Sequence, residues 1–253
     1  MLFTLFSGKV ASHTVIDTGS IPMRAIRTHF RFSHQDYDTA QLAKMQLGGD
    51  KLLTATLALQ ARQHNVLSKL LPKTGHFMLW DHYPEAEVID STHASQYYYH
   101  SHRTSAREHG HFHLFGLLSA DGSQRDASAV WQEDEAPSHL IAIGMNPKGL
   151  PTRVFCPNQW VTKGHWLPAQ VILNQLDHFI VLGPARWSHI SQWLAGFVML
   201  FRPQIEAALL ARDVHAQQLR QKRQWRRFWA DESIEVINYI PIDLHQQIAW
   251  VDN

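Results

Sequence analysis

The first part of the chain places apolar residues at the spacing of an amphipathic helix. This pattern runs over residues 36–71 and predicts two helices. Gly48-Gly49 is the expected break between them, because glycine has a low helix propensity. Pro72 is expected to end the second helix, since proline cannot continue the helical hydrogen-bonding pattern.

The helical spacing returns in the last third of the chain. A short helix is expected over residues 169–176, and a long one is expected from about Ser188 with a kink at Pro203. The apolar stretch IEVINYIPIDL, which starts at Ile234, predicts one strand close to the C-terminal end.

The middle of the chain shows the shorter period of β-strands. Four candidate strands are separated by turn-forming stretches, and they cover residues 95–102, 109–118, 139–145 and 152–160. Residues 79–90 are interpreted as a loop or the entry to a strand. Residues 119–137 are interpreted as an exposed acidic loop.

These elements predict a fold of the α+β class. We expect an antiparallel sheet that carries a histidine-rich hairpin and is flanked by helices from both ends of the chain. Residues 34–253 are expected to form a single domain. Residues 1–33 have little periodicity and are expected to be a poorly packed extension.

The composition excludes several classes of protein. Lys and Arg (23) nearly balance Asp and Glu (22), so no overall field attracts nucleic acid or an anionic membrane. The single cysteine, Cys156, excludes a disulfide framework and a zinc site built from thiolates alone. The apolar runs are too short for a signal peptide or a membrane span. We therefore expect a cytoplasmic protein with no membrane partner and no nucleic-acid partner, while the oligomeric state stays open.

Histidine is the unusual residue, with 18 copies in the chain. His100 and His102 form one HxH pair, and His109, His111 and His113 repeat the same spacing after a short gap. Residues two apart on a strand point to the same face, so a hairpin of these segments is expected to place all five imidazoles on one face.

The residues that alternate with the histidine face along the two strands support this hairpin. They are apolar or aromatic, and they would cover the opposite face of the sheet: Tyr97, Tyr99, Phe112 and Leu114. Convergent neutral imidazoles are typical ligands of transition metals and not of magnesium or calcium. A divalent transition metal, iron or zinc first, is therefore the expected cofactor, with four preferred ligands: His100, His102, His111 and His113. The alternative is that these histidines are polar residues on a solvated sheet face.

Other polar residues near the hairpin have candidate roles. Glu108 and His109 are the candidate catalytic groups beside the ion. Candidate substrate-binding residues are Arg103, Arg107 and Tyr98. Further ligands, or partners of the ligands, are sought among Asp81, His82, Asp90, His93 and His139.

Longer motifs in this region resemble known families. YYYHSH (residues 97–102) and EHGHFHLF (residues 108–115), with the later HLIAIGMNPKGLPTRVF and NQWVTKGHW, resemble an uncharacterised bacterial family with a domain of unknown function. That resemblance covers about residues 80–250 and implies no established activity. The array His100-x-His102-x5-Glu108 is similar to the first metal motif of cupins, although Thr152 stands where the second cupin motif has a histidine. We treat it as similarity of site and not of fold.

The sequence leaves three functions open. The first is a metal-dependent enzyme, oxygen-using or hydrolytic, that acts on a small molecule. The second follows from residues 109–115, which are similar to the signature of histidine triad nucleotide hydrolases and transferases; that resemblance makes His111 the nucleophile. The third is a non-enzymatic metal- or RNA-binding protein, with the basic and aromatic run of residues 220–229 as the RNA contact. This run is more typical of an amphipathic helix.

Overall fold

One seven-stranded sheet forms the centre of the structure, a computed structural model that describes residues 25–72, 77–102, 108–124, 136–221 and 225–252. The strands lie in the order β1-β7-β6-β5-β4-β3-β2, and all neighbours are antiparallel except β1 and β7. They are β1 (Ile26–Arg27), β2 (Tyr83–Asp90), β3 (Ser95–His100), β4 (Gly110–Gly116), β5 (Ser138–Met145), β6 (Pro151–Pro157) and β7 (Val236–Pro241). The predicted α+β class is confirmed.

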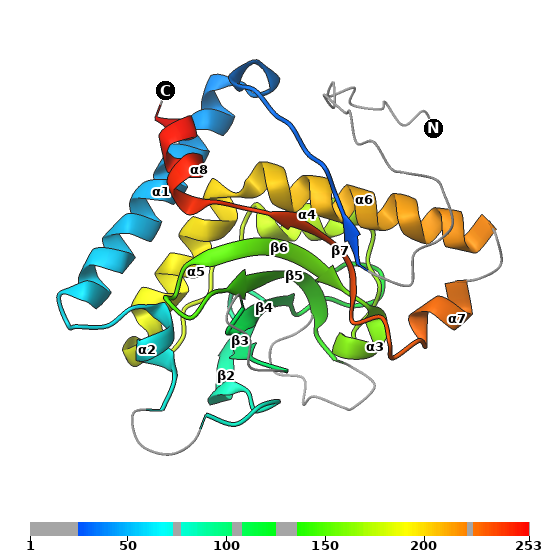
Figure 1. Cartoon of the computed structure of the whole chain (residues 1–253), viewed down its shortest axis with the longest axis horizontal. Helices are drawn as coiled ribbons and strands as arrows, with labels where there is room; N and C mark the ends of the chain where they lie inside the picture. Colours follow the sequence, from blue (N-terminus) through cyan, green and yellow to red (C-terminus); the bar gives the residue numbers. More distant parts are fainter. Residues whose placement is uncertain (1–24, 73–76, 103–107, 125–135, 222–224, 253) are drawn as a thin grey trace.

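Helices from both ends of the chain cover the outer side of the curved sheet, where α1, α4, α5 and α6 lie together in Figure 1. The helices are α1 (Thr39–Gln60), α2 (Val66–Leu70), α3 (Gln159–Thr162), α4 (Ala169–Leu176), α5 (Ser188–Leu200), α6 (Arg202–Gln221), α7 (Trp225–Trp229) and α8 (Leu244–Val251). Two short 3-10 turns, η1 (His34–Asp36) and η3 (Ala185–Trp187), precede α1 and α5.

The four central strands and the C-terminal strand lie where the alternating pattern predicts them, as β3 to β7. Residues 80–90 contain a full strand, β2, which pairs with β3 across a bulged register. The predicted acidic loop falls largely on residues 125–135, which lie outside the described residues. β1 belongs to the segment predicted to be an extension, and its pairing with β7 continues through a bond from Thr28 N–H to the Tyr239 carbonyl (2.9 Å). The division at residue 34 stays a prediction.

The predicted helix break at Gly48-Gly49 is wrong. α1 runs through both glycines, and a short α2 follows after residues 61–65. Gly48 lies against α5 so closely that an added Cβ would be 2.6 Å from Met199 Cβ and 2.8 Å from the Gly196 carbonyl oxygen. The glycine therefore permits a close helix crossing, and tertiary packing outweighs its low helix propensity.

The predicted kink at Pro203 is a complete break between two helices. α5 and α6 meet at Phe201 with a bend of 72°, and Pro203 lies in the first turn of α6. A proline is tolerated there because the first turn of a helix leaves its N–H groups without intrahelical partners. Within the described ranges no single helix is long and apolar enough to cross a membrane, whereas this bent pair taken together meets the length and composition test.

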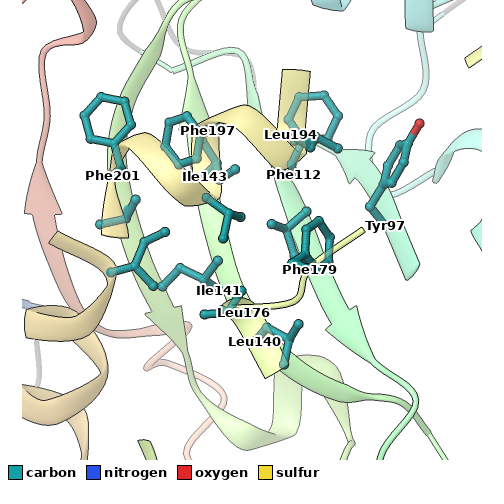
Figure 2. Packing of buried hydrophobic residues seen from close by; sticks show 14 of the residues in the cluster. Tyr97, Phe112, Leu140, Ile141, Ile143, Leu176, Phe179, Leu194, Phe197 and Phe201 are labelled. Carbon is teal, nitrogen blue, oxygen red and sulfur yellow. The ribbon is translucent and has the colours of Figure 1, made fainter. Parts of the chain in front are cut away.

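The alternation of side chains along the strands gives the sheet two different faces. Tyr97, Tyr99, Phe112 and Leu114 are fully buried on the face that packs against the helices, as predicted. Figure 2 shows Phe112 and Ile143 of neighbouring strands beside Leu194 and Phe197 of α5. This apolar layer holds the strands in register, because a slip by one residue would turn the apolar set away from the helices.

The crossing of α1 and α5 generates a stability prediction. Gly48→Ala should lower the free energy of unfolding by about 1–3 kcal/mol, because the new methyl group overpacks the crossing. Gly49→Ala is the matched control, since its Cβ would meet only Leu200 Cδ1 at 3.7 Å. The control should gain about 0.5–1 kcal/mol from helix propensity. Urea denaturation measures both, and equal effects of the two substitutions would contradict this account of the crossing.

Candidate metal centre

The register of the sheet aligns two rows of side chains on the face opposite the helices. Adjacent partners across β3, β4, β5, β6 and β7 form each row. The first row is His100, His111, Gly144, Arg153 and Pro241, and the second is Tyr98, His113, Ala142, Phe155 and Tyr239. Because His100 pairs with His111, and His113 follows one row away, three imidazoles meet at the junction of β3 and β4.

These three rings converge through their Nε2 atoms. His100 Nε2 lies 2.9 Å from His111 Nε2 and 3.0 Å from His113 Nε2, and all three side chains are buried. Ligand nitrogens that share one tetrahedral zinc ion at about 2.0–2.1 Å lie about 3.3 Å apart. The spacing in this cluster is close to that value, and the cluster of His100, His111 and His113 can hold a metal ion.

Burial keeps the imidazoles of this cluster neutral. Desolvation, followed by the charges of neighbouring histidines, lowers the pKa of His100 to about 2. The pKa values of His111 and His113 are also lowered, and desolvation is again the largest cause. A neutral imidazole carries one proton and one free lone pair, so one Nε2–H can donate to one neighbouring Nε2, but three converging Nε2 atoms cannot all be satisfied by one another. Lone pairs gathered in this way are the donor set that a transition metal takes up.

His102 stands at the edge of the cluster. Its Nε2 lies 3.2 Å from His100 Nε2, its ring stacks on Trp80 (centroids 4.1 Å apart), and its Nδ1 lies 3.4 Å from a carboxylate oxygen of Glu235. The compact group that can hold a metal does not include it within the described part of the chain. The prediction that His102 is a ligand therefore stays open.

Glu108 lies behind His111 and not at the point where the Nε2 atoms meet. Its Oε1 is 3.6 Å from His111 Nδ1, which is slightly too far for a hydrogen bond. Arg153 binds the same carboxylate with two bonds, from Nε (2.7 Å) and from Nη2 (2.8 Å). Burial alone would raise the pKa of Glu108, but the interactions with His111 and Arg153 lower it to about 2. Glu108 is thus an anion, fixed by Arg153, that lies on the outer side of His111.

Gly144 provides the space for this arrangement. A Cβ at this position would lie 2.9 Å from Arg153 Cγ and 3.0 Å from Glu108 Oε2. Gly144 and Arg153 are not among the site residues predicted from the sequence, because both lie more than 25 residues beyond the histidine motifs along the chain. The only signal for them is the turn at residues 147–149, which makes β5 and β6 a hairpin and sets Gly144 opposite Arg153.

The prediction that all five histidines share one face is wrong for His109. This residue precedes β4, and its Nδ1 lies 2.7 Å from the Tyr99 hydroxyl. Its ring also contacts Phe77 (centroids 5.0 Å apart), so it lies with residues of the helix-covered core. The reason is that the strand pairing starts only at Gly110, so the alternation of the strand does not extend to His109. In the histidine triad interpretation His109 is the first histidine of the signature, and it does not lie with His111 and His113.

The remaining candidates lie at several places. Tyr98 belongs to the second row and lies between the stacked ring of His82 (centroids 3.7 Å apart) and the ring of His113 (5.2 Å). Arg103 and Arg107 lie outside the described residues. Asp81 is exposed, and Asp90 pairs with His93 (2.7 Å) at the opposite end of β3 from His100. Two of the additional candidates contact the cluster: His139 through His113 (2.9 Å) and His82 through an edge-on ring contact with His100 (centroids 5.5 Å apart).

Two cavities flank the cluster. The larger, of ≈ 630 Å³, is lined by His111 and His113 together with Glu108, Arg153, Phe155 and Tyr239. The smaller, of ≈ 330 Å³, is lined by His100 and by aromatic residues that include Trp80 and Tyr98. His102 lines both cavities. Pockets of about 300–1,000 Å³ are typical of small-molecule sites.

Aromatic residues of the basic and aromatic run near the C-terminal end pack against other parts of the protein. Phe228 and Trp229 are buried in a small cluster with Leu219 and Ile237, and Trp166 packs against it. The central residues of the run, 222–224, lie outside the described residues. The RNA-binding alternative therefore gains no support from these aromatic side chains, which contact protein.

Comparison with known proteins gives one family. Residues 48–242, most of the chain, match the family model described as Domain of unknown function (DUF6969). The expected resemblance to a domain of unknown function is confirmed. Searches of curated proteins and of solved structures found no match.

The buried imidazoles generate a prediction about pH. Their folded pKa values lie below the ordinary value of 6.5, so the unfolded chain binds more protons below that pH. The stability of metal-free protein should be fully present above about pH 6.5 and should fall as the pH drops, by up to about 1.4 kcal/mol per pH unit for each histidine. Urea denaturation with a chelator present measures this slope.

His100→Gln is the comparison for this experiment, because glutamine takes up no proton. Its slope should be shallower than that of the wild type by about one proton's worth. An identical slope in the two proteins would show that His100 is not held in its neutral form by the fold.

Proposed function

We propose that this chain, which belongs to the DUF6969 family, is a metal-dependent enzyme that acts on a small molecule beside the cluster of His100, His111 and His113. The observation that carries the proposal is the convergence of three buried imidazoles, which offer one ligand nitrogen each within 4.8 Å of one another. His100 Nε2 lies 2.9 Å from His111 Nε2 and 3.0 Å from His113 Nε2. Two of these rings can share one hydrogen bond, but the third Nε2 then has no partner of its own away from water, whereas a bound ion would take up the lone pairs of all three.

The donor set limits which metal fits. Three neutral imidazoles favour zinc, iron, copper or nickel over magnesium and calcium, which prefer oxygen ligands. Three protein ligands on a four-coordinate ion leave one position for water or substrate, as in catalytic zinc sites. Bound there, an ion of this kind supplies Lewis-acid activation of water or of a substrate oxygen, or oxygen chemistry if it is iron. We infer zinc or iron as the resident metal.

The chain's own residues support a catalytic site over a purely structural one. A structural zinc site is closed by four protein ligands, whereas His111 and His113 line an open cavity of ≈ 630 Å³. The wall of that cavity combines the aromatic side chains of Phe155 and Tyr239 with the charged pair of Glu108 and Arg153. An apolar wall with a few fixed polar groups is typical of a small-molecule site.

Elemental analysis of tag-free protein purified without chelator tests the proposal. The wild type should contain about one equivalent of a first-row transition metal, and the double variant His100→Ala/His111→Ala should contain almost none, because two of three ligands are removed. His178→Ala is the matched control, since His178 is exposed and its ring contacts the Asn174 carbonyl of its own neighbouring turn. The control should keep its metal.

Circular dichroism establishes that each variant is folded before its metal is counted. If the double variant does not fold, the single variant His111→Gln, which keeps a side chain of similar reach, takes its place. Wild-type protein that contains no metal and takes up none of the added zinc, iron, copper or nickel would overturn the proposal. A variant that is folded and still binds a full equivalent would move the site away from this cluster.

A further inference from the structure

His139 reaches the histidine face of the sheet because of an irregularity in β5. In a regular register, Leu114 opposite Ile141 would be followed by Phe115 opposite Leu140, but Phe115 pairs with His139 instead. The bulge turns both Leu140 and Ile141 into the helix-covered core, where both are fully buried. His139 therefore points to the face that carries His113. Bulges re-aim side chains in this way and are frequent beside functional sites.

The re-aimed ring meets His113 on the side away from the cluster. His139 Nε2 lies 2.9 Å from His113 Nδ1, while the other ring nitrogen of His113 lies 3.0 Å from His100 Nε2. His113 therefore has a partner for Nδ1 that is separate from the point where the Nε2 atoms converge. A metal-binding histidine needs such a partner, because the hydrogen bond made by one ring nitrogen fixes which nitrogen is free to bind the ion.

We propose that His139 is a positioning residue, whose Nε2 accepts a hydrogen bond from the Nδ1–H of His113 and so presents the Nε2 lone pair of His113 to the metal. The proposal rests on the proposed function, since it gives His139 a role towards the same ion. It also distinguishes the two ligands on β4: a neutral ring fixes His113, whereas the carboxylate of Glu108 stands behind His111. Neutral support adds no negative charge at His113, which preserves the Lewis acidity of the ion.

The test compares two substitutions that differ in one property. His139→Leu removes the acceptor and keeps an apolar side chain, while His139→Gln keeps an acceptor oxygen at a similar reach. Zn²⁺ affinity is measured by competition with a chromophoric chelator. His139→Leu should bind Zn²⁺ about 10–100-fold more weakly than the wild type, and His139→Gln should stay within about threefold. A merely structural role would lower thermal stability in either variant without this split in affinity.

A second measurement separates this inference from the proposed function. Nitrogen NMR of metal-free protein labelled at histidine reports which ring nitrogen of His113 carries the proton. The wild type should show the Nδ1–H form, and His139→Leu should show a mixture of the two forms. The inference fails if wild-type His113 carries its proton on Nε2, or if folded His139→Leu binds Zn²⁺ as tightly as the wild type.

Failure of the proposed function would look different. In that case the wild type would bind no Zn²⁺, and the proton position on His113 would still decide whether His139 is its acceptor. If His139→Leu does not fold, the affinity of His139→Gln and the proton position in the wild type decide the question.

Discussion

Buried polar atoms need partners, and the histidine cluster concentrates this requirement at one point of the sheet. His100 and His111 are opposite each other on adjacent strands, so their Nε2 atoms lie 2.9 Å apart on a face that already excludes water from His113. One neutral imidazole can donate from Nε2–H to the Nε2 of another, but the third Nε2 is then left without a partner of its own. Burial also disfavours the protonated imidazoles, whose charges would repel one another. An ion in the centre would take up the lone pairs of all three rings, and Glu108 and His139 lie behind two of them, where the outer partners of metal ligands are found.

The rest of the fold serves to hold that point in place. One face of the sheet is a continuous apolar layer against α1, α4, α5 and α6, and the close contact of α1 with α5 at Gly48 fixes part of that layer. A site on paired strands with a packed second face is held more exactly than one on loops. The opposite face can then carry rows of polar side chains, which would be costly to bury in an apolar core. Gly144 leaves space for Arg153 and Glu108, and the bulge in β5 turns His139 towards His113.

Features that depend on residues close together in the sequence could be predicted from it, whereas features that depend on contacts between distant segments could not. The alternation along residues 95–102 and 109–118 is local, and it predicted the hairpin, its apolar face and a larger set of histidines that includes the three that converge. The prediction that His109 lies on the histidine face is wrong because a pattern of alternating residues does not show where strand pairing begins. The prediction of a helix break at Gly48 is wrong because the role of this glycine depends on its contact with α5, which follows about 150 residues later along the chain.

The outer partners were the hardest to predict. Arg153 meets Glu108 only through the pairing of three strands, and a direct reading of the sequence gives no register between them. His139 was one of several candidates, and the bulge that selects it is a feature of backbone pairing and not of residue type.

The central claim is that His100, His111 and His113 bind one metal ion through Nε2. A crystal of protein purified without chelator, measured on both sides of the absorption edge of the metal found in it, tests this directly. The account predicts one anomalous peak about 2.0–2.2 Å from each of the three Nε2 atoms and facing the larger cavity. A well-ordered cluster with no anomalous peak, even after soaking with zinc or iron, would contradict it. So would a peak bound by other residues.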